Sequence, residues 1–77
     1  MVSIYTTPSC GYCKMAKQFM QEQGVEYQEH DVSADADKRK EMVDKSGQMG
    51  VPVIEVGEDL MVGFDKAKLS KMLGLEE

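Results

Sequence analysis

Residues 6 to 20 read TTPSCGYCKMAKQFM and hold both cysteines of the chain, Cys10 and Cys13, with two residues between them. The stretch starts at the end of a short β-branched run and passes through a Pro-Ser pair that is typical of a turn. Beyond Cys13 the apolar residues recur at helical spacing as far as Gly24, where a helix can stop. The cysteines are therefore expected where a first strand gives way to a first helix.

The first half of the chain continues this alternation of strands and helices. Val2 to Thr6 is the first predicted strand, and a second is predicted from Val25 to Val32. Ser33 is the expected cap of a helix that runs to about Lys45 and ends at Gly47.

The last third of the chain predicts a hairpin and a final helix. VPVIEV (51–56) and LMVGF (60–64) are strand patterns, and the Gly-Glu-Asp segment 57–59 suits a hairpin loop. Asp65 is expected to cap a helix whose apolar face ends before Gly74.

The order of elements is thus βαβ followed by ββα. A βαβ unit requires a parallel pair of strands with a right-handed crossover, and a lone hairpin is barely stable, so the hairpin should extend the same sheet. We expect one α/β domain over residues 1–77, with a four-stranded mixed sheet flanked by three helices.

Composition excludes several classes of function. The formal net charge is −5 and the nine basic residues are scattered, whereas nucleic-acid binding depends on neutralising phosphates. The longest apolar stretches are only a few residues, and the chain lacks the charged start and apolar region of a signal peptide. We expect a cytoplasmic monomer that binds neither nucleic acid nor membrane.

Structural roles for the cysteine pair are poorly supported. A disulfide stabilises chiefly by closing a loop in the unfolded chain, and one between Cys10 and Cys13 would enclose only two residues. A structural zinc site needs four ligands, and the only other candidate is His30, the sole histidine. Two carboxylates flank His30, so a surface position is the simpler interpretation, and no metal site is predicted.

The remaining interpretation is that the cysteines are reagents. At a strand–helix junction Cys10 lies at the helix N-terminus, where free N–H groups and the helix dipole stabilise the nucleophilic thiolate. Cys13 lies one turn further on the same face, close enough to attack a mixed disulfide at Cys10 and release the reduced substrate. Lys14 would add positive potential, although a lysine at this place is commonly just solvated. The hypothesis is that Cys10 attacks and Cys13 resolves.

A C-x-x-C pair near a βαβ pattern is typical of thioredoxin-like redox proteins. More specifically, YTTPSCGYCKMAKQFM (5–20), GVPVIEV (50–56) and VGFDKAKL (62–69) resemble the active-site helix, the Val-Pro loop and the Gly-containing turn of glutaredoxin-like proteins. The resemblance covers essentially the whole chain and is strongest to the short bacterial redoxins, including those that serve ribonucleotide reductase. It implies a thioredoxin fold and a thiol–disulfide oxidoreductase that reduces protein disulfides.

The resemblance also implies further site residues. Pro52 is expected to be cis and to lie against the cysteines, with the backbone N–H and C=O of Val51 offered to an extended substrate. Tyr12 resembles the family's aromatic residue that shields the thiolate and contacts substrate, although an exposed ring is the simpler interpretation. Gly63 and Phe64 resemble the turn of redoxins that receive electrons from a flavin disulfide reductase.

The chain departs from the glutathione-using members of that family. They carry a lysine, a threonine and a second turn glycine where this chain has Thr7, Gly50 and Phe64. These departures imply an NAD(P)H-dependent flavin reductase as electron donor, with glutathione as the alternative co-substrate and no bound cofactor. Gly11 replaces a proline whose loss is associated in the family with iron–sulfur cluster binding, which is a minor alternative. Met49, just before the Val-Pro loop, is either an adaptable docking residue or core filler.

Overall fold

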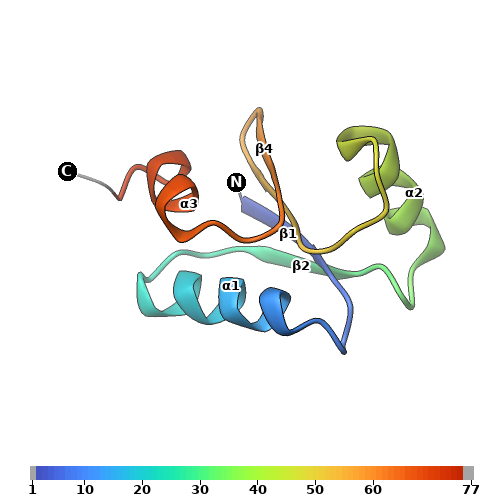
Figure 1. Ribbon diagram of the computed structural model, residues 1–77, viewed down its shortest axis with the longest axis horizontal. Helices are drawn as coiled ribbons and strands as arrows, with labels where there is room; N and C mark the ends of the chain where they lie inside the picture. The colour runs from blue at the N-terminus through green and yellow to red at the C-terminus, as the bar shows by residue number, and fades with distance from the viewer. Residues whose placement is uncertain (1, 76–77) are drawn as a thin grey trace.

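The computed structural model describes residues 2–75. Its seven elements follow the predicted order, with the bounds β1 (Val2–Thr6), α1 (Gly11–Glu22), β2 (Gln28–Asp31), α2 (Ala36–Ser46), β3 (Val53–Val56), β4 (Asp59–Val62) and α3 (Lys66–Met72). Figure 1 shows α1 and α3 on one side of the strands and α2 on the other. None of the helices within residues 2–75 is long and apolar enough to cross a membrane.

The four strands form one mixed sheet in the order β2-β1-β3-β4. Strand β1 pairs in parallel with β2 and antiparallel with β3, and β3 pairs antiparallel with β4. The predicted fold class is therefore confirmed. Since β1 lies between β2 and β3, the strand that leads to Cys10 is held by strands on both sides.

The sheet is buried on both faces. Ile4 of β1 and Ile54 of β3 point into the larger apolar cluster, together with residues of α1, β4 and α3. Tyr5 and Val53, one residue away on each strand, point into a second cluster with Met42 of α2. This alternation along β1 and β3 is what a strand with period two produces, and it fixes the pairing register.

The predicted start of β2 at Val25 is wrong, because the strand begins at Gln28. The backbone N–H of Val25 donates to the carbonyl of Met20 at 2.9 Å and so closes the end of α1. Pairing with β1 then extends from Ser3 opposite Gln28 to Thr6 opposite Asp31. The residues just after α1 are used to terminate the helix and have no strand partner.

The predicted cap of α2 is also wrong. Asp35 is the N-cap, and its side chain accepts the N–H of Lys38 at 3.1 Å. The N–H and hydroxyl of Ser33 both bond to Asp31 Oδ1 in the preceding turn. Ser33 and Asp35 could each cap this helix, but the N–H and hydroxyl of Ser33 are already bonded to Asp31, so Asp35 is the cap. Gly47, in the left-handed region at φ 73°, ends α2 as expected.

The hairpin loop is shorter than predicted. Val56 pairs with Asp59, so Gly57 and Glu58 alone form the turn. Gly57 has φ 58°, a left-handed conformation at the first central position that favours glycine in a tight hairpin. The expected cap of α3 is confirmed, because the side chain of Asp65 accepts the N–H of Lys68.

Met42 is the fully buried residue of α2, and it packs the helix against the sheet. Met42→Ala should lower the free energy of unfolding by about 2–5 kcal/mol, the usual cost of truncating a large core residue. Urea denaturation followed by circular dichroism would measure it. The matched control is Met15→Ala, whose side chain is half exposed and whose loss should change stability by less than about 0.5 kcal/mol. Equal effects of the two substitutions would contradict the packing described for α2.

Candidate active site

Cys10 lies where the loop that follows β1 meets the start of α1. It is the N-cap of the helix in extended conformation, and its backbone N–H donates to the carbonyl of Thr7 at 3.2 Å. Its sulfur accepts the backbone N–H of Cys13 at 3.1 Å. The helix start thus directs one of its free backbone N–H groups at the Cys10 sulfur.

Cys13 has the opposite environment. Its side chain is fully buried, whereas Cys10 is partly exposed. Burial, reinforced by the neighbouring Cys10, raises the pKa of the Cys13 thiol to about 12. Cys13 is therefore protonated at neutral pH and shielded from bulky reagents, while Cys10 can meet a partner. Both thiols are free in this structure.

An ion pair lies one helical turn beyond Cys13. Lys17 Nζ donates to Glu29 Oε2 at 2.7 Å, and the buried Thr6 hydroxyl donates to the same oxygen at 2.8 Å. The hydrogen bond from Lys17 lowers the pKa of Glu29, and the positive charge of Lys17 partly offsets the rise in the pKa of Cys13. Lys17 was not among the predicted site residues, because its spacing of four residues from Cys13 places it on the same helix face but is by itself a weak signal.

The loop before β3 forms the second wall of the site. The peptide bond between Val51 and Pro52 is cis, as the resemblance implied, and Pro52 is buried. The Val51 carbonyl accepts a hydrogen bond from the Cys10 thiol, with a sulfur–oxygen distance of 3.8 Å. The structure thus brings Val51 to Cys10 across 41 residues of sequence.

The turn after β4 lies against the same loop. The N–H of Gly63 donates to the carbonyl of Pro52 at 2.8 Å, and Gly63 has φ 86°, which favours glycine. The ring of Phe64 packs against Phe19 of α1, with 6.2 Å between ring centroids. Gly63 is therefore joined directly to the Val51–Pro52 loop, while Phe64 is fixed to α1.

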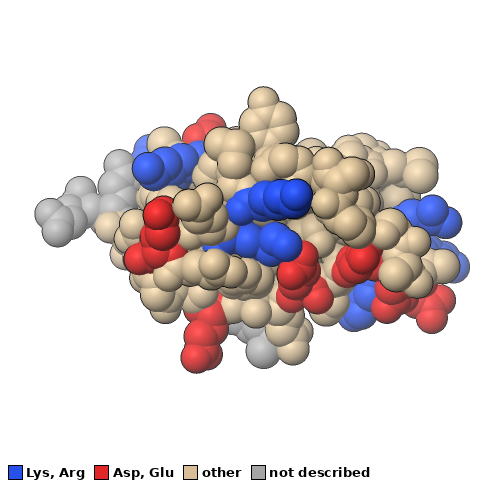
Figure 2. All heavy atoms as spheres, turned by 90° about the horizontal axis from the view of Figure 1, so that it is seen from below, with Lys and Arg blue, Asp and Glu red and all other residues tan. Residues whose placement is uncertain are grey.

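The other predicted site residues lie on the exposed first turn of α1. Tyr12 is 64% exposed and lines a shallow hollow with Gly11 and Met15. Lys14 is also exposed. Figure 2 shows that basic and acidic side chains are interspersed over one face of the molecule, with neither sign gathered into a large patch. The exposed side chains of Tyr12 and Met15 give this first turn of α1 an apolar surface.

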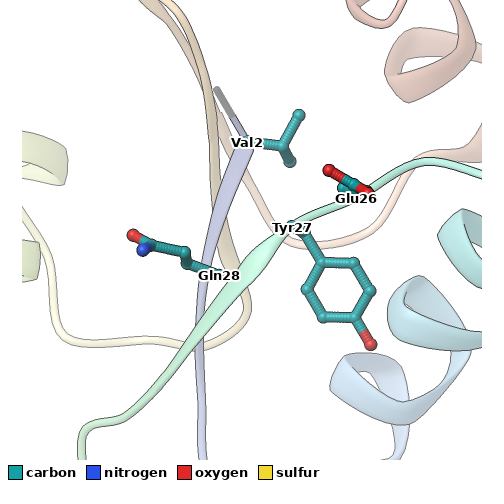
Figure 3. A pocket seen from close by; sticks show the side chains of 4 residues that line it. All are labelled: Val2, Glu26, Tyr27 and Gln28. Carbon is teal, nitrogen blue, oxygen red and sulfur yellow. The ribbon is translucent and has the colours of Figure 1, made fainter.

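Two further features, the sole histidine and a hollow in the surface, lie outside the groups described above. Within residues 2–75 no three His, Cys, Asp or Glu side chains are grouped so that they could hold a metal ion, and the ring of His30 lies 5.1 Å from that of Tyr5. A hollow of about 310 Å³ is lined by Val2, Glu26, Tyr27 and Gln28 (Figure 3). The hollow lies at the start of β1, whereas Cys10 follows the other end of that strand.

Comparison with known proteins identifies the family. The Glutaredoxin family model matches residues 2–61. The chain belongs to the glutaredoxin family. It is 37% identical over 73 residues to an uncharacterized glutaredoxin-like 8.6 kDa protein in the rubredoxin operon of Clostridium pasteurianum, covering 95% of this chain and 97% of that protein. It is 39% identical over 64 residues to glutaredoxin 3 of Escherichia coli (strain K12), covering 83% and 77% of the two chains.

Solved structures agree with this assignment. The crystal structure of the thioredoxin-like protein BC3987 superposes with a TM-score of 0.88 at 28% identity, covering 94% of this chain and 99% of the other. The fold is therefore the thioredoxin fold. Since glutaredoxins are thiol–disulfide oxidoreductases, this glutaredoxin is an enzyme of that class, and its C-x-x-C pair is the expected redox centre.

Proposed function

We propose that this glutaredoxin reduces protein disulfides, with Cys10 as the attacking sulfur and Cys13 as the resolving one. The observation that carries the proposal is the contrast between the two thiols. Cys10 is partly exposed with an N–H group directed at its sulfur, whereas Cys13 is buried with a pKa raised to about 12. Only one of the two can meet a substrate disulfide first.

The thiol–disulfide exchange takes place in two steps. The Cys10 thiolate attacks one substrate sulfur, the substrate S–S bond breaks, and its electron pair leaves on the second substrate sulfur, which takes up a proton. Cys13 then gives up its proton and attacks Cys10 Sγ, which forms the Cys10–Cys13 disulfide and expels the first substrate sulfur as a thiolate that is protonated in turn. Two electrons pass to the substrate, and no bound cofactor is required because the dithiol carries them.

The substrate is an extended peptide segment around a disulfide. The Val51 backbone lies beside Cys10 in the loop that leads into β3, where a peptide can add main-chain hydrogen bonds. Tyr12, two residues after Cys10, offers an exposed aromatic ring, and aromatic residues are enriched at interfaces. These groups would hold a substrate sulfur at Cys10.

A flavin disulfide reductase is the proposed electron donor in preference to glutathione. Thr7 offers no positive charge to a glutathione carboxylate, and Gly50 offers no side-chain hydroxyl. Phe64 carries a ring packed on Phe19 where the glutathione-using relatives have a glycine. Each missing polar contact costs a small ligand about 1 kcal/mol, whereas a protein reductase docks over a surface and does not need them.

The test is NADPH consumption with a protein disulfide, run once with a thioredoxin-reductase-like flavoenzyme and once with millimolar glutathione plus glutathione reductase. Turnover should be higher in the flavoenzyme arm. Thr7→Lys should raise the glutathione arm by roughly fivefold, the equivalent of about 1 kcal/mol, and leave the flavoenzyme arm unchanged. Thr7→Gln, which adds length without charge, is the control. Faster turnover of the unmodified protein with glutathione would contradict the proposed donor.

A further inference from the structure

In the loop before Val51, the side chain of Gln48 forms hydrogen bonds with the backbone of Gly50. The amide of Gln48 bonds both backbone polar groups of Gly50: Gly50 N–H donates to Oε1 at 2.5 Å, and Nε2 donates to the Gly50 carbonyl at 3.1 Å. The Ser46 hydroxyl lies 2.9 Å from the Gln48 carbonyl and accepts the Gln48 N–H at 3.4 Å. We call the Gln48–Gly50 pair the amide clamp.

The amide clamp depends on the glycine. A Cβ atom built on Gly50 would lie 2.6 Å from Gln48 Oε1, closer than real Cβ contacts come. The obstacle is the end of a flexible side chain, so an alanine at this position would push the Gln48 amide aside rather than break the backbone. Gly50 is not in the left-handed region, and glycine is needed here for space and not for its dihedral angles.

The amide clamp determines what the loop presents beside Cys10. Both polar groups of Gly50 are already bonded, so the next backbone groups offered to a peptide are those of Val51, whose carbonyl contacts Cys10. Met49, between the two clamped residues, is 69% exposed. A thioether on a fixed loop gives an adaptable apolar contact to a partner surface.

We propose that Gln48 is a positioning residue, which clamps Gly50 and thereby fixes Met49 and the Val51 backbone for substrates large enough to reach across this loop. The inference rests on the proposed function, because it assigns the loop to the docking of a protein disulfide at Cys10. A small disulfide that touches only Cys10 should not depend on the clamp. Gln48 therefore sets the preference for protein over small-molecule disulfides.

Amide hydrogen exchange tests the clamp without reference to activity. In Gln48→Ala the Gly50 N–H loses its acceptor, and its exchange should be at least tenfold faster than in the unmodified protein. Gln28→Ala is the matched control, because Gln28 is an exposed glutamine of β2 at the far end of the sheet. Unchanged exchange of Gly50 in Gln48→Ala would overturn the clamp.

Kinetics test the positioning role. With a protein disulfide, Gln48→Ala should lower kcat/KM five- to tenfold through KM, whereas kcat/KM for 2-hydroxyethyl disulfide should stay within twofold. Gly50→Ala should have the same effect, and the double variant should be no worse than either single one, because both remove one interaction. Gln48→Glu keeps the acceptor and loses the donor, so it should fall between Gln48→Ala and the unmodified protein.

The outcomes separate the two proposals. Equal losses on both disulfides, or no loss on either, would overturn the positioning role even if Gly50 exchange responds as expected. Failure of the unmodified protein to reduce either disulfide would overturn the proposed function and with it the docking role, while the exchange experiment would still decide whether the clamp exists.

Discussion

Cys10→Ser is expected to lower the multiple-turnover reduction of a protein disulfide by roughly a thousandfold or more, to the level of the assay without protein. A hydroxyl at the start of α1 cannot form the mixed disulfide, and Cys13 is fully buried and cannot replace it. The measurement is NADPH consumption coupled through the reductase that works best with the unmodified protein.

Ser9→Ala is the control for this substitution, since Ser9 is the exposed neighbour of Cys10 and has no assigned role. Its activity should stay within twofold of the unmodified protein. Circular dichroism of Cys10→Ser should show an unchanged fold, because serine also caps helices well. Turnover retained by Cys10→Ser would show that Cys13 can start the reaction and would refute the division of roles.

Iodoacetamide should alkylate Cys10 at least a hundredfold faster than Cys13 at pH 7. Only the thiolate reacts quickly, and a thiol with a pKa of about 12 is ionised to about one part in 10⁵ at that pH. Burial adds a steric barrier. Because the pKa of Cys13 is raised, its labelling rate should climb about tenfold for each pH unit between 7 and 9, as long as the protein stays folded.

Peptide mapping by mass spectrometry after timed quenching gives both labelling rates in one experiment. In strong denaturant the burial of Cys13 is lost, so the two rates should converge, which is the control that the difference belongs to the fold. Equal rates in the folded protein would mean that Cys13 is accessible and ionised, in conflict with the structure.

Features with a local chemical cause were predictable from the sequence. β1 was predicted with its observed bounds because Val2 to Thr6 is a short β-branched and aromatic run that is closed by Pro8 and Ser9. Asp65 caps α3 and Gly47 ends α2 as expected, since caps are set by one side chain or one dihedral angle. The position of Cys10 at the start of α1 followed from the same local reasoning.

Features that depend on distant partners were not predictable in this way. The start of β2 depends on which residues lie opposite β1. The cap of α2 was missed for a local reason, because Asp31, two residues earlier, already bonds the N–H and hydroxyl of Ser33. The placement of Val51 beside Cys10 came from family resemblance, because no local pattern joins residues 41 positions apart.

Two side-chain clusters of the site were missed altogether. The Lys17–Glu29 ion pair joins α1 to β2, two elements whose relative placement no local pattern gives, and the Gln48–Gly50 clamp depends on one rotamer in a loop. A lysine four residues after Cys13 and a glycine two residues after Gln48 are weak signals, since such spacings occur often without contact. The structure was needed to show which of them meet.

Cys13→Ser gives the most direct test of the central claim that Cys10 attacks and Cys13 resolves. The reduced variant is mixed with one equivalent of a protein disulfide, quenched with acid and examined by intact mass and peptide mapping. We expect a stable mixed disulfide joining the substrate to Cys10, which the unmodified protein does not accumulate because Cys13 displaces the substrate and leaves a Cys10–Cys13 disulfide. A Cys13→Ser variant that forms no adduct at Cys10, or an equal adduct at Cys13 in Cys10→Ser, would contradict it.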